Sequence, residues 1–176
     1  MIYIIIGPSG SGKTLVGEYL KEKGIKELIS HTTRAPRQGE VEGISYHFVD
    51  EITFHDTEKV EENYYAGNYY GVSLKEIETK TKESDVFVVT EINGARAFRK
   101  KFGNKVRIIY VESSPRKLRE RMKRRGDSRE SIRRRIDTYR KNHEAKQRFF
   151  ADVVLDNNNS KKTLYKKVDY VLKSMR

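Results

Sequence analysis

The hydrophobic residues of this 176-residue chain form short apolar runs separated by segments of helical spacing. Residues 2–6 are an unbroken apolar run, and residues 86–92, 106–111 and 153–155 are three further runs rich in β-branched side chains. Apolar runs of this length are typical of strands that are buried on both faces of a parallel sheet. We therefore predict that these four segments form one parallel β-sheet.

Helical patterns lie between these predicted strands. Apolar residues recur at helical spacing from Leu15 until the chain reaches Gly24, and a second such segment, lined by Ala95, Phe98 and Phe102, ends at Gly103. Further helices are predicted after the N-cap pair Ser114-Pro115, after a capping box of Asp127 and Glu130, and over residues 164–172. Strands that alternate with helices predict a doubly wound α/β core.

Residues 30–72 depart from this alternation. They lack a helical period, and many of their aromatic residues lie among turn-forming residues. We interpret this stretch as a small β-rich lobe inserted into the core and used for recognition. The alternative is that its aromatic residues only fill the core of the lobe itself.

Residues 7–14 directly follow the first predicted strand and fill every position of the phosphate-binding pattern G-x-x-x-x-G-K-[ST]. The positions are Gly7, Pro8, Ser9, Gly10, Ser11, Gly12, Lys13 and Thr14. Glycines let successive backbone N–H groups point at phosphate oxygens, and the next helix adds its positive end. We expect Lys13 to reach the β- and γ-phosphates and the Thr14 hydroxyl to bind Mg²⁺. The motif predicts that the chain binds a nucleoside triphosphate.

Charge is concentrated in one part of the chain. The formal net charge is +12, and residues 96–148 contain 21 Lys and Arg against 6 Asp and Glu. Such a region can bind nucleic acid, an anionic surface or a polyphosphate, and much of it can simply be a solvated helix face. The chain has no cysteine, no segment long enough to cross a bilayer and no secretory signal, which favours the cytoplasm.

Residues 30–48 read S-H-T-T-R-A-P-R-Q-G-E-V-E-G-I-S-Y-H-F and suggest a second anion site. Arg34 and Arg37, near Tyr46, can hold a phosphate through charge-assisted and bidentate hydrogen bonds. This segment resembles the guanylate kinase signature S-x-T-T-R-x-P-R-x-G-E-x-x-G-x-x-Y-x-F. The resemblance continues through residues 67–71 and residues 121–135, in the order found in that family, and spans nearly the whole chain.

The resemblance implies a P-loop NTPase-type fold and transfer of the γ-phosphoryl group of ATP to GMP or dGMP with Mg²⁺. It divides one domain, residues 1–176, into a core of residues 1–29, 73–115 and 149–176, a GMP-binding lobe of residues 30–72 and a lid of residues 116–148. By similarity, GMP would be bound by Ser30, Arg34, Arg37, Tyr46, Glu61, Tyr70, Val72 and Glu91, with Ser30 and Glu61 reading the guanine edge. Catalysis would rest on Lys13, Arg34, Arg121, Arg125 and Arg135, and Asn157 with Arg125 would contact ATP.

Several residues depart from the family pattern. Glu91 stands where the family usually has an aspartate at the acceptor site, and Val72 stands where a serine or threonine commonly touches guanine. Ser73 follows, but with Glu76 it forms a capping box. Glu62 is an alternative to Glu61 as the base-reading acid, and Asn157 is alternatively a turn asparagine.

Three other functions remain as alternatives. The first is a nucleoside monophosphate kinase with broader or different base specificity, and the second is a non-catalytic interaction module of guanylate-kinase type. The third is nucleic-acid binding through the basic region, which is disfavoured because that region lacks interleaved aromatic residues. We expect small-molecule nucleotides rather than nucleic acid or membrane as partners, with either a monomer or a homodimer in solution.

Overall fold

The computed structural model describes residues 1–65 and 67–174; residues 66, 175 and 176 of the predicted single domain lie outside the described residues. A central five-stranded sheet has the order β2-β7-β1-β8-β9, and its neighbouring strands all pair in parallel. This confirms the predicted doubly wound core. The strands are β1 (Ile2–Ile6), β2 (Lys26–Glu27), β7 (Val86–Val89), β8 (Val106–Glu112) and β9 (Val153–Asp156).

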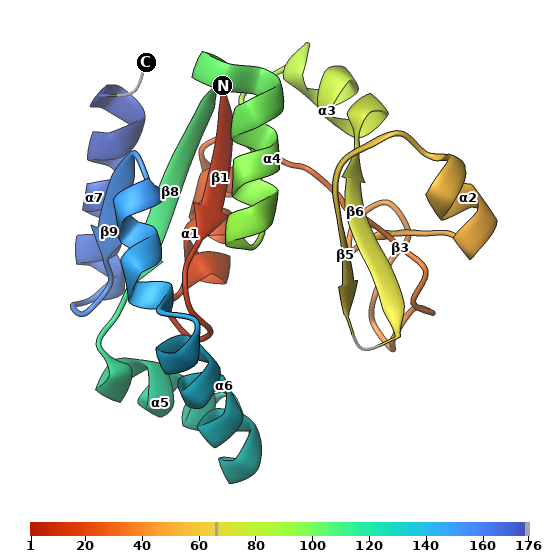
Figure 1. The fold of residues 1–176 in the computed structure, drawn as a ribbon. Helices are drawn as coiled ribbons and strands as arrows, with labels where there is room; N and C mark the ends of the chain where they lie inside the picture. Colours follow the sequence, from red (N-terminus) through yellow and green to blue (C-terminus); the bar gives the residue numbers. More distant parts are fainter. Residues whose placement is uncertain (66, 175–176) are drawn as a thin grey trace.

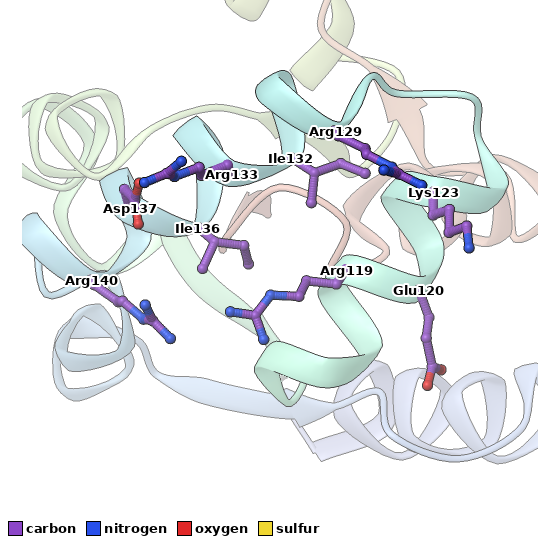
Figure 2. Close-up of a pocket in the computed structure, with 9 residues that line it drawn as sticks. All are labelled: Arg119, Glu120, Lys123, Arg129, Ile132, Arg133, Ile136, Asp137 and Arg140. Carbon is purple, nitrogen blue, oxygen red and sulfur yellow. The ribbon is translucent and has the colours of Figure 1, made fainter.

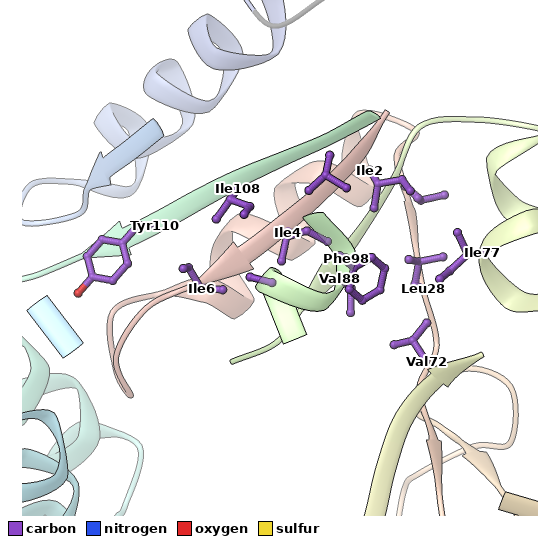
Figure 3. Packing of buried hydrophobic residues seen from close by; sticks show 13 residues of the cluster. Ile2, Ile4, Ile6, Leu28, Val72, Ile77, Val88, Phe98, Ile108 and Tyr110 are labelled. Atoms are coloured by element: carbon purple, nitrogen blue, oxygen red, sulfur yellow. The ribbon is translucent and has the colours of Figure 1, made fainter. Parts of the chain in front are cut away.

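Strand β1 is buried over its whole length because helices cover both faces of the sheet. Alternate residues of β1 enter two separate hydrophobic clusters, with Ile2, Ile4 and Ile6 on one face and Tyr3 and Ile5 on the other. Figure 3 shows the first cluster. Its helical partners are α3 (Leu74–Thr81) and α4 (Ile92–Phe102), and those of the second cluster are α1 (Lys13–Glu22) and α7 (Lys161–Ser174).

A second sheet lies beside the core (Figure 1) and is formed by residues 30–73. Its strand order is β4-β3-β6-β5, with parallel pairing only between β3 and β4. The strands are β3 (His31–Thr32), β4 (His47–Phe48), β5 (Lys59–Tyr65) and β6 (Asn68–Ser73). This sheet matches the β-rich lobe that the sequence predicts.

The lobe also contains one helix that the sequence pattern does not reveal, α2 (Glu51–Asp56). The Asp50 carboxylate caps it by accepting a hydrogen bond of 2.7 Å from the Thr53 backbone N–H. Its six residues bury only Phe54. A helix of fewer than two turns with one buried residue is too short to show a period in the sequence.

Helices α5 (Pro115–Arg124) and α6 (Arg129–Lys141) project from one end of the core (Figure 1). They pack against each other through Leu118, Met122 and Ile136. Short 3₁₀ segments η1 (Gly103–Lys105) and η2 (Glu144–Phe150) lead into β8 and β9. Among the helices of the described ranges, none combines the length and apolarity of a bilayer-spanning segment.

Two predicted boundaries are wrong. The run at residues 86–92 ends as a strand at Val89, because Glu91 is already the N-cap of α4 and Ile92 is its first residue. The cap of α6 is Ser128, whose hydroxyl accepts from the Ser131 N–H at 3.2 Å, because Arg125 engages the Asp127 carboxylate instead. The caps at Ser114 and Ser73 are confirmed.

Candidate active site

The loop between β1 and α1 has the backbone geometry that the phosphate-binding motif predicts. Gly7 and Gly12 have φ of 141° and 105°, in the region that favours glycine. A Cβ atom on Gly7 would lie 2.3 Å from the Val111 carbonyl oxygen, and one on Gly12 would lie 2.3 Å from Asn157 Nδ2. Both positions therefore require glycine for conformation and for space.

Lys13 is the first residue of α1, and its ammonium group folds back over the loop. Lys13 Nζ donates hydrogen bonds to the carbonyl oxygens of Gly7 at 2.7 Å and Pro8 at 3.2 Å. Burial lowers the pKa of Lys13, and the nearby carboxylates of Glu91 and Glu144 oppose that change. The lysine charge thus lies at the mouth of the loop. There, phosphate oxygens would compete with the two carbonyl oxygens for its N–H groups.

Arg121 and Asn157 brace this loop from the neighbouring elements. Arg121 Nη1 donates to the Ser11 carbonyl at 3.0 Å and to Ser113 Oγ at 2.9 Å, and Arg121 Nη2 donates to the Asn157 carbonyl at 2.7 Å. Asn157 is buried, and its Nδ2 donates to the Ser11 carbonyl at 2.7 Å. Helix α5 of the lid and the segments that follow β8 and β9 of the core are therefore tied to one turn of the loop.

The other two predicted catalytic arginines of the lid take different positions. Arg135 Nη1 donates to Ser9 Oγ at 2.9 Å, which brings α6 to the edge of the loop. Arg125 is more than half exposed and pairs with Asp127, its Nε donating to Asp127 Oδ1 at 3.0 Å. In this conformation, only Arg121 and Arg135 contact the loop.

On the inserted lobe, Arg34 is held at the centre of a small polar and aromatic cluster. Arg34 Nη2 donates to both carboxylate oxygens of Glu40, at 2.8 and 2.9 Å. Its guanidinium carbon lies 5.4 Å from the centre of the Tyr46 ring, and the rings of Tyr46 and Tyr70 meet edge to face at 5.9 Å. Arg37 is exposed and contacts Glu40 through its backbone: its N–H donates to Glu40 Oε2 at 2.8 Å, and its carbonyl accepts from the Glu40 N–H at 3.0 Å.

A cavity of about 630 Å³ separates the inserted lobe from the core, a size suited to one nucleotide. Three elements line it: β5 of the lobe, the start of α4, and the segment that follows α6. Its acidic residues are Glu61, Glu62, Glu91 and Glu144. The influence of Glu91 and Glu144 on Lys13 places the cavity next to the phosphate loop.

Glu61 and Glu144 are half-buried acids of this cavity, whereas Glu62 and Glu91 are exposed. Burial raises the pKa of Glu61 to about 7, with a further rise from the charge of Glu62 and an opposing hydrogen bond from the Val72 N–H. Burial and the charge of Glu91 also raise the pKa of Glu144, and Lys13 lowers it. A half-buried acid with one backbone hydrogen-bond partner can accept further hydrogen bonds from a ligand that donates them.

Comparisons with known proteins agree with this geometry. The family model described as guanylate kinase matches residues 1–175. The chain belongs to the guanylate kinase family. It is 35% identical over 181 residues to a guanylate kinase of Prochlorococcus marinus subsp. pastoris, covering 98% of this chain and 97% of that protein. A guanylate kinase of another Prochlorococcus marinus strain is 37% identical over 145 residues, covering 77% and 78% of the two chains.

A solved structure supports the same family at the level of the fold. The crystal structure of guanylate kinase from Anaplasma phagocytophilum superposes with a TM-score of 0.72 at 26% sequence identity. The match covers 99% of this chain and 85% of the other. Since relatives of known sequence and structure cover the whole chain, the core and the inserted lobe both belong to the guanylate kinase fold.

Six of the eight residues assigned to the GMP site do not line the cavity: Arg34, Arg37, Tyr46 and Tyr70 of the lobe cluster, and also Val72 and Ser30. Val72 is fully buried in the hydrophobic cluster with Leu28 and Ile77 (Figure 3), because β6 turns its side chain into the core at this position. Its predicted place among the GMP-binding side chains is therefore wrong. Ser30 lies just before β3, where its carbonyl accepts from the His47 N–H at 2.9 Å, and it is not among the residues that line the cavity.

Arg121 and Asn157 have structural partners in addition to the roles predicted for them. Arg121 is predicted to act in catalysis and Asn157 to contact ATP, and here both donate to the Ser11 carbonyl of the loop, while Arg121 also donates to the Asn157 carbonyl. A buried asparagine amide and a guanidinium surrounded by carbonyl oxygens are satisfied by those oxygens. In this guanylate kinase, both residues position the loop.

Some residues of the site are missed by the sequence reasoning. Glu40 positions Arg34, and its place in the G-E pair of the family signature could have indicated this. Glu144, with Asn142 and Gln147, enters the cavity from the segment after the lid helices. No local pattern marks these three residues, because only the return of the chain from α6 to β9 brings them to β5.

Proposed function

We propose that this protein transfers the γ-phosphoryl group of ATP to GMP, and also to dGMP, producing ADP and the nucleoside diphosphate. The observation that carries this proposal is the presence of two anion-binding arrangements, one on the core and one on the inserted lobe. One is the glycine loop with Lys13, and the other is the cluster of Arg34, Tyr46 and Tyr70. Two cationic sites can hold two mutually repelling phosphate groups in line for direct transfer.

The donor half of the site would bind the triphosphate through the loop N–H groups and Lys13. The lysine ammonium would exchange its carbonyl partners, Gly7 and Pro8, for β- and γ-phosphate oxygens. Mg²⁺ would neutralise charge between these phosphates when bound. The Thr14 hydroxyl at the exposed start of α1 suits this ion, which keeps most of its waters and needs no dedicated cage of acids. Within the described ranges, no group of three His, Cys, Asp or Glu forms such a cage.

The acceptor half would hold the phosphate of GMP with Arg34, Arg37, Tyr46 and Tyr70. Arg34 is already oriented by Glu40, so less side-chain entropy is lost when a phosphate binds. Glu61 is the acid that we assign to the guanine edge, where a carboxylate can accept from N1–H and from the 2-amino group. Adenine lacks that pair of donors and would leave the acid unpaired.

Charge neutralisation and positioning would provide the catalysis, because phosphoryl transfer requires no protein nucleophile. Arg135 is already at the loop through Ser9 and would stabilise the transferring group. Arg125 would join it when α5 and α6 close over ATP and exchange Asp127 for phosphate. Closure would also exclude water and so prevent hydrolysis of the triphosphate.

The test is a steady-state assay of ADP formation from ATP and Mg²⁺ with GMP, dGMP, AMP, CMP and UMP in turn. We expect turnover with GMP and dGMP and little with the other three. Turnover with several bases at similar rates would replace the guanine assignment with a broader monophosphate kinase. If no acceptor gives ADP and titrated ATP shows no Mg²⁺-dependent binding, the protein is an interaction module and the proposal fails.

A further inference from the structure

A second cavity, of about 600 Å³, lies between α5 and α6 on the lid (Figure 2). We call it the α5–α6 groove. Its floor contains Ile132 and Ile136, which belong to or pack against the small cluster that joins the two helices. Five cationic side chains surround this floor, two from α5 and three from α6: Arg119, Lys123, Arg129, Arg133 and Arg140. An apolar floor with a cationic rim is suited to a large polyatomic anion.

The positive charge of the groove is only partly balanced by the protein. In the described part of the chain, none of the five cations forms an ion pair or a side-chain hydrogen bond. Two acids, Glu120 and Asp137, also line the groove. Glu120 forms ion pairs with Arg116 at 3.4 Å and with Lys117 at 3.6 Å, neither of which lines the groove. The groove therefore keeps an excess of positive charge that attracts anions.

Helical spacing separates this groove from the phosphate loop. Arg119 and Lys123 are four residues apart on α5, as are Arg129 and Arg133 on α6, so each pair lies on one helix face. Like charges at this spacing repel each other and weaken a helix. The arginines that contact the loop, Arg121 and Arg135, lie on other faces of the same helices. The lid thus carries two separate cationic faces, and only one of them faces the phosphate loop.

The chemistry of the rim favours phosphate groups. Four of the five cations are arginines, whose planar forks bind phosphate oxygens through paired hydrogen bonds. Nucleic acid is disfavoured because no aromatic side chain lines the groove to stack with a base. We propose that the α5–α6 groove binds a small-molecule anion with several phosphate groups, at a site separate from the glycine loop. Inorganic polyphosphate and nucleoside polyphosphates share this chemistry.

Calorimetric titration with inorganic tripolyphosphate at physiological salt tests the proposal. All proteins carry Lys13→Ala, which weakens binding at the glycine loop. Arg119→Gln with Arg133→Gln should reduce tripolyphosphate affinity about tenfold or more. The control is Arg124→Gln with Arg134→Gln, which removes the same charge from the same two helices outside the groove. The control should change affinity by less than about twofold, because neither Arg124 nor Arg134 lines the groove and a charge outside it acts only through screened, long-range attraction.

Equal losses in the two double variants would mean general charge attraction and would overturn the proposal. Absence of tripolyphosphate binding in the Lys13→Ala protein would overturn it as well.

A second measurement needs no groove variant, so misfolding of such a variant cannot affect it. In the Lys13→Ala protein, the methyl NMR signals of Ile132 and Ile136 should shift when tripolyphosphate is added. Unchanged signals would refute the site. If the Lys13→Ala protein binds ATP more tightly than tripolyphosphate, the groove recognises a nucleoside polyphosphate. If it binds the two equally, the groove recognises the phosphate groups alone. Because kinase activity is not the readout, these results are independent of the proposed reaction.

Discussion

Replacing Glu61 by glutamine tests how this protein recognises guanine. Burial raises the pKa of the Glu61 carboxyl to about 7 from an ordinary 4.5, so the acid is protonated below about pH 7 in the empty protein. Only the carboxylate accepts hydrogen bonds from both donors of guanine. Binding of GMP should therefore strengthen as the pH rises through 7 in the wild type, and this dependence should be absent in Glu61→Gln.

The size of the effect follows from that pKa. Glu61 is about one tenth ionised at pH 6 and about nine tenths ionised at pH 8, so KM for GMP should fall about tenfold over this interval. At pH 8, Glu61→Gln should raise KM for GMP by about 10- to 100-fold, because hydrogen bonds to a charged acceptor are lost. KM for ATP should stay unchanged in the same assays.

A stability measurement checks the same pKa without any ligand. The rise from 4.5 to about 7 corresponds to at most about 3 kcal/mol against the ionised form. Since the folded-state pKa is raised, the stability that Glu61 contributes is fully present below pH 4.5 and is lost as the pH rises through 7. Urea unfolding should show the wild type losing free energy of unfolding relative to Glu61→Gln over that window.

Glu62→Gln is the matched control, because Glu62 is the exposed neighbour on the same strand. It should leave KM for GMP within about twofold of the wild type. The phosphate of GMP itself titrates near pH 6 and changes KM for GMP in the same way for every protein. Comparing Glu61→Gln with Glu62→Gln therefore removes the contribution of the phosphate. An unchanged pH profile in Glu61→Gln, or a large effect of Glu62→Gln, would refute the assignment of Glu61.

Three further substitutions test other parts of the site. Lys13→Ala should lower kcat about 100- to 1,000-fold with little change in Tm; retained turnover would disprove its role at the phosphates. Arg121→Gln should lower the free energy of unfolding by about 2–4 kcal/mol, since several oxygens of the loop lose their donor; an unchanged denaturation midpoint would contradict the bracing role. Val72→Thr should destabilise the fold by about 1–3 kcal/mol through a buried hydroxyl. It should leave the GMP-to-AMP rate ratio unchanged, whereas a shifted ratio would return position 72 to the base site.

The sequence by itself determined the parts of this protein that depend on local interactions. The glycine loop with Lys13 and Thr14 could be read directly, because its backbone angles and charges follow from eight consecutive residues. The strand at residues 2–6 and the caps at Ser114 and Ser73 were equally legible. Apolar runs that alternate with helical periods also determined the parallel sheet, since both faces of such a sheet must be covered.

Only the tertiary structure decided which side chains meet across the cavity. Glu61 and Glu62 are adjacent in the sequence, and an irregularity in pairing between Lys59 and Glu61 breaks the simple alternation of faces along β5. Local sequence therefore cannot tell which acid is buried. The return of the chain after α6 brings Glu144 to the cavity, and packing of β6 on the core turns Val72 inward. These contacts join segments far apart in the chain, so they depend on how the elements pack and not on any local pattern.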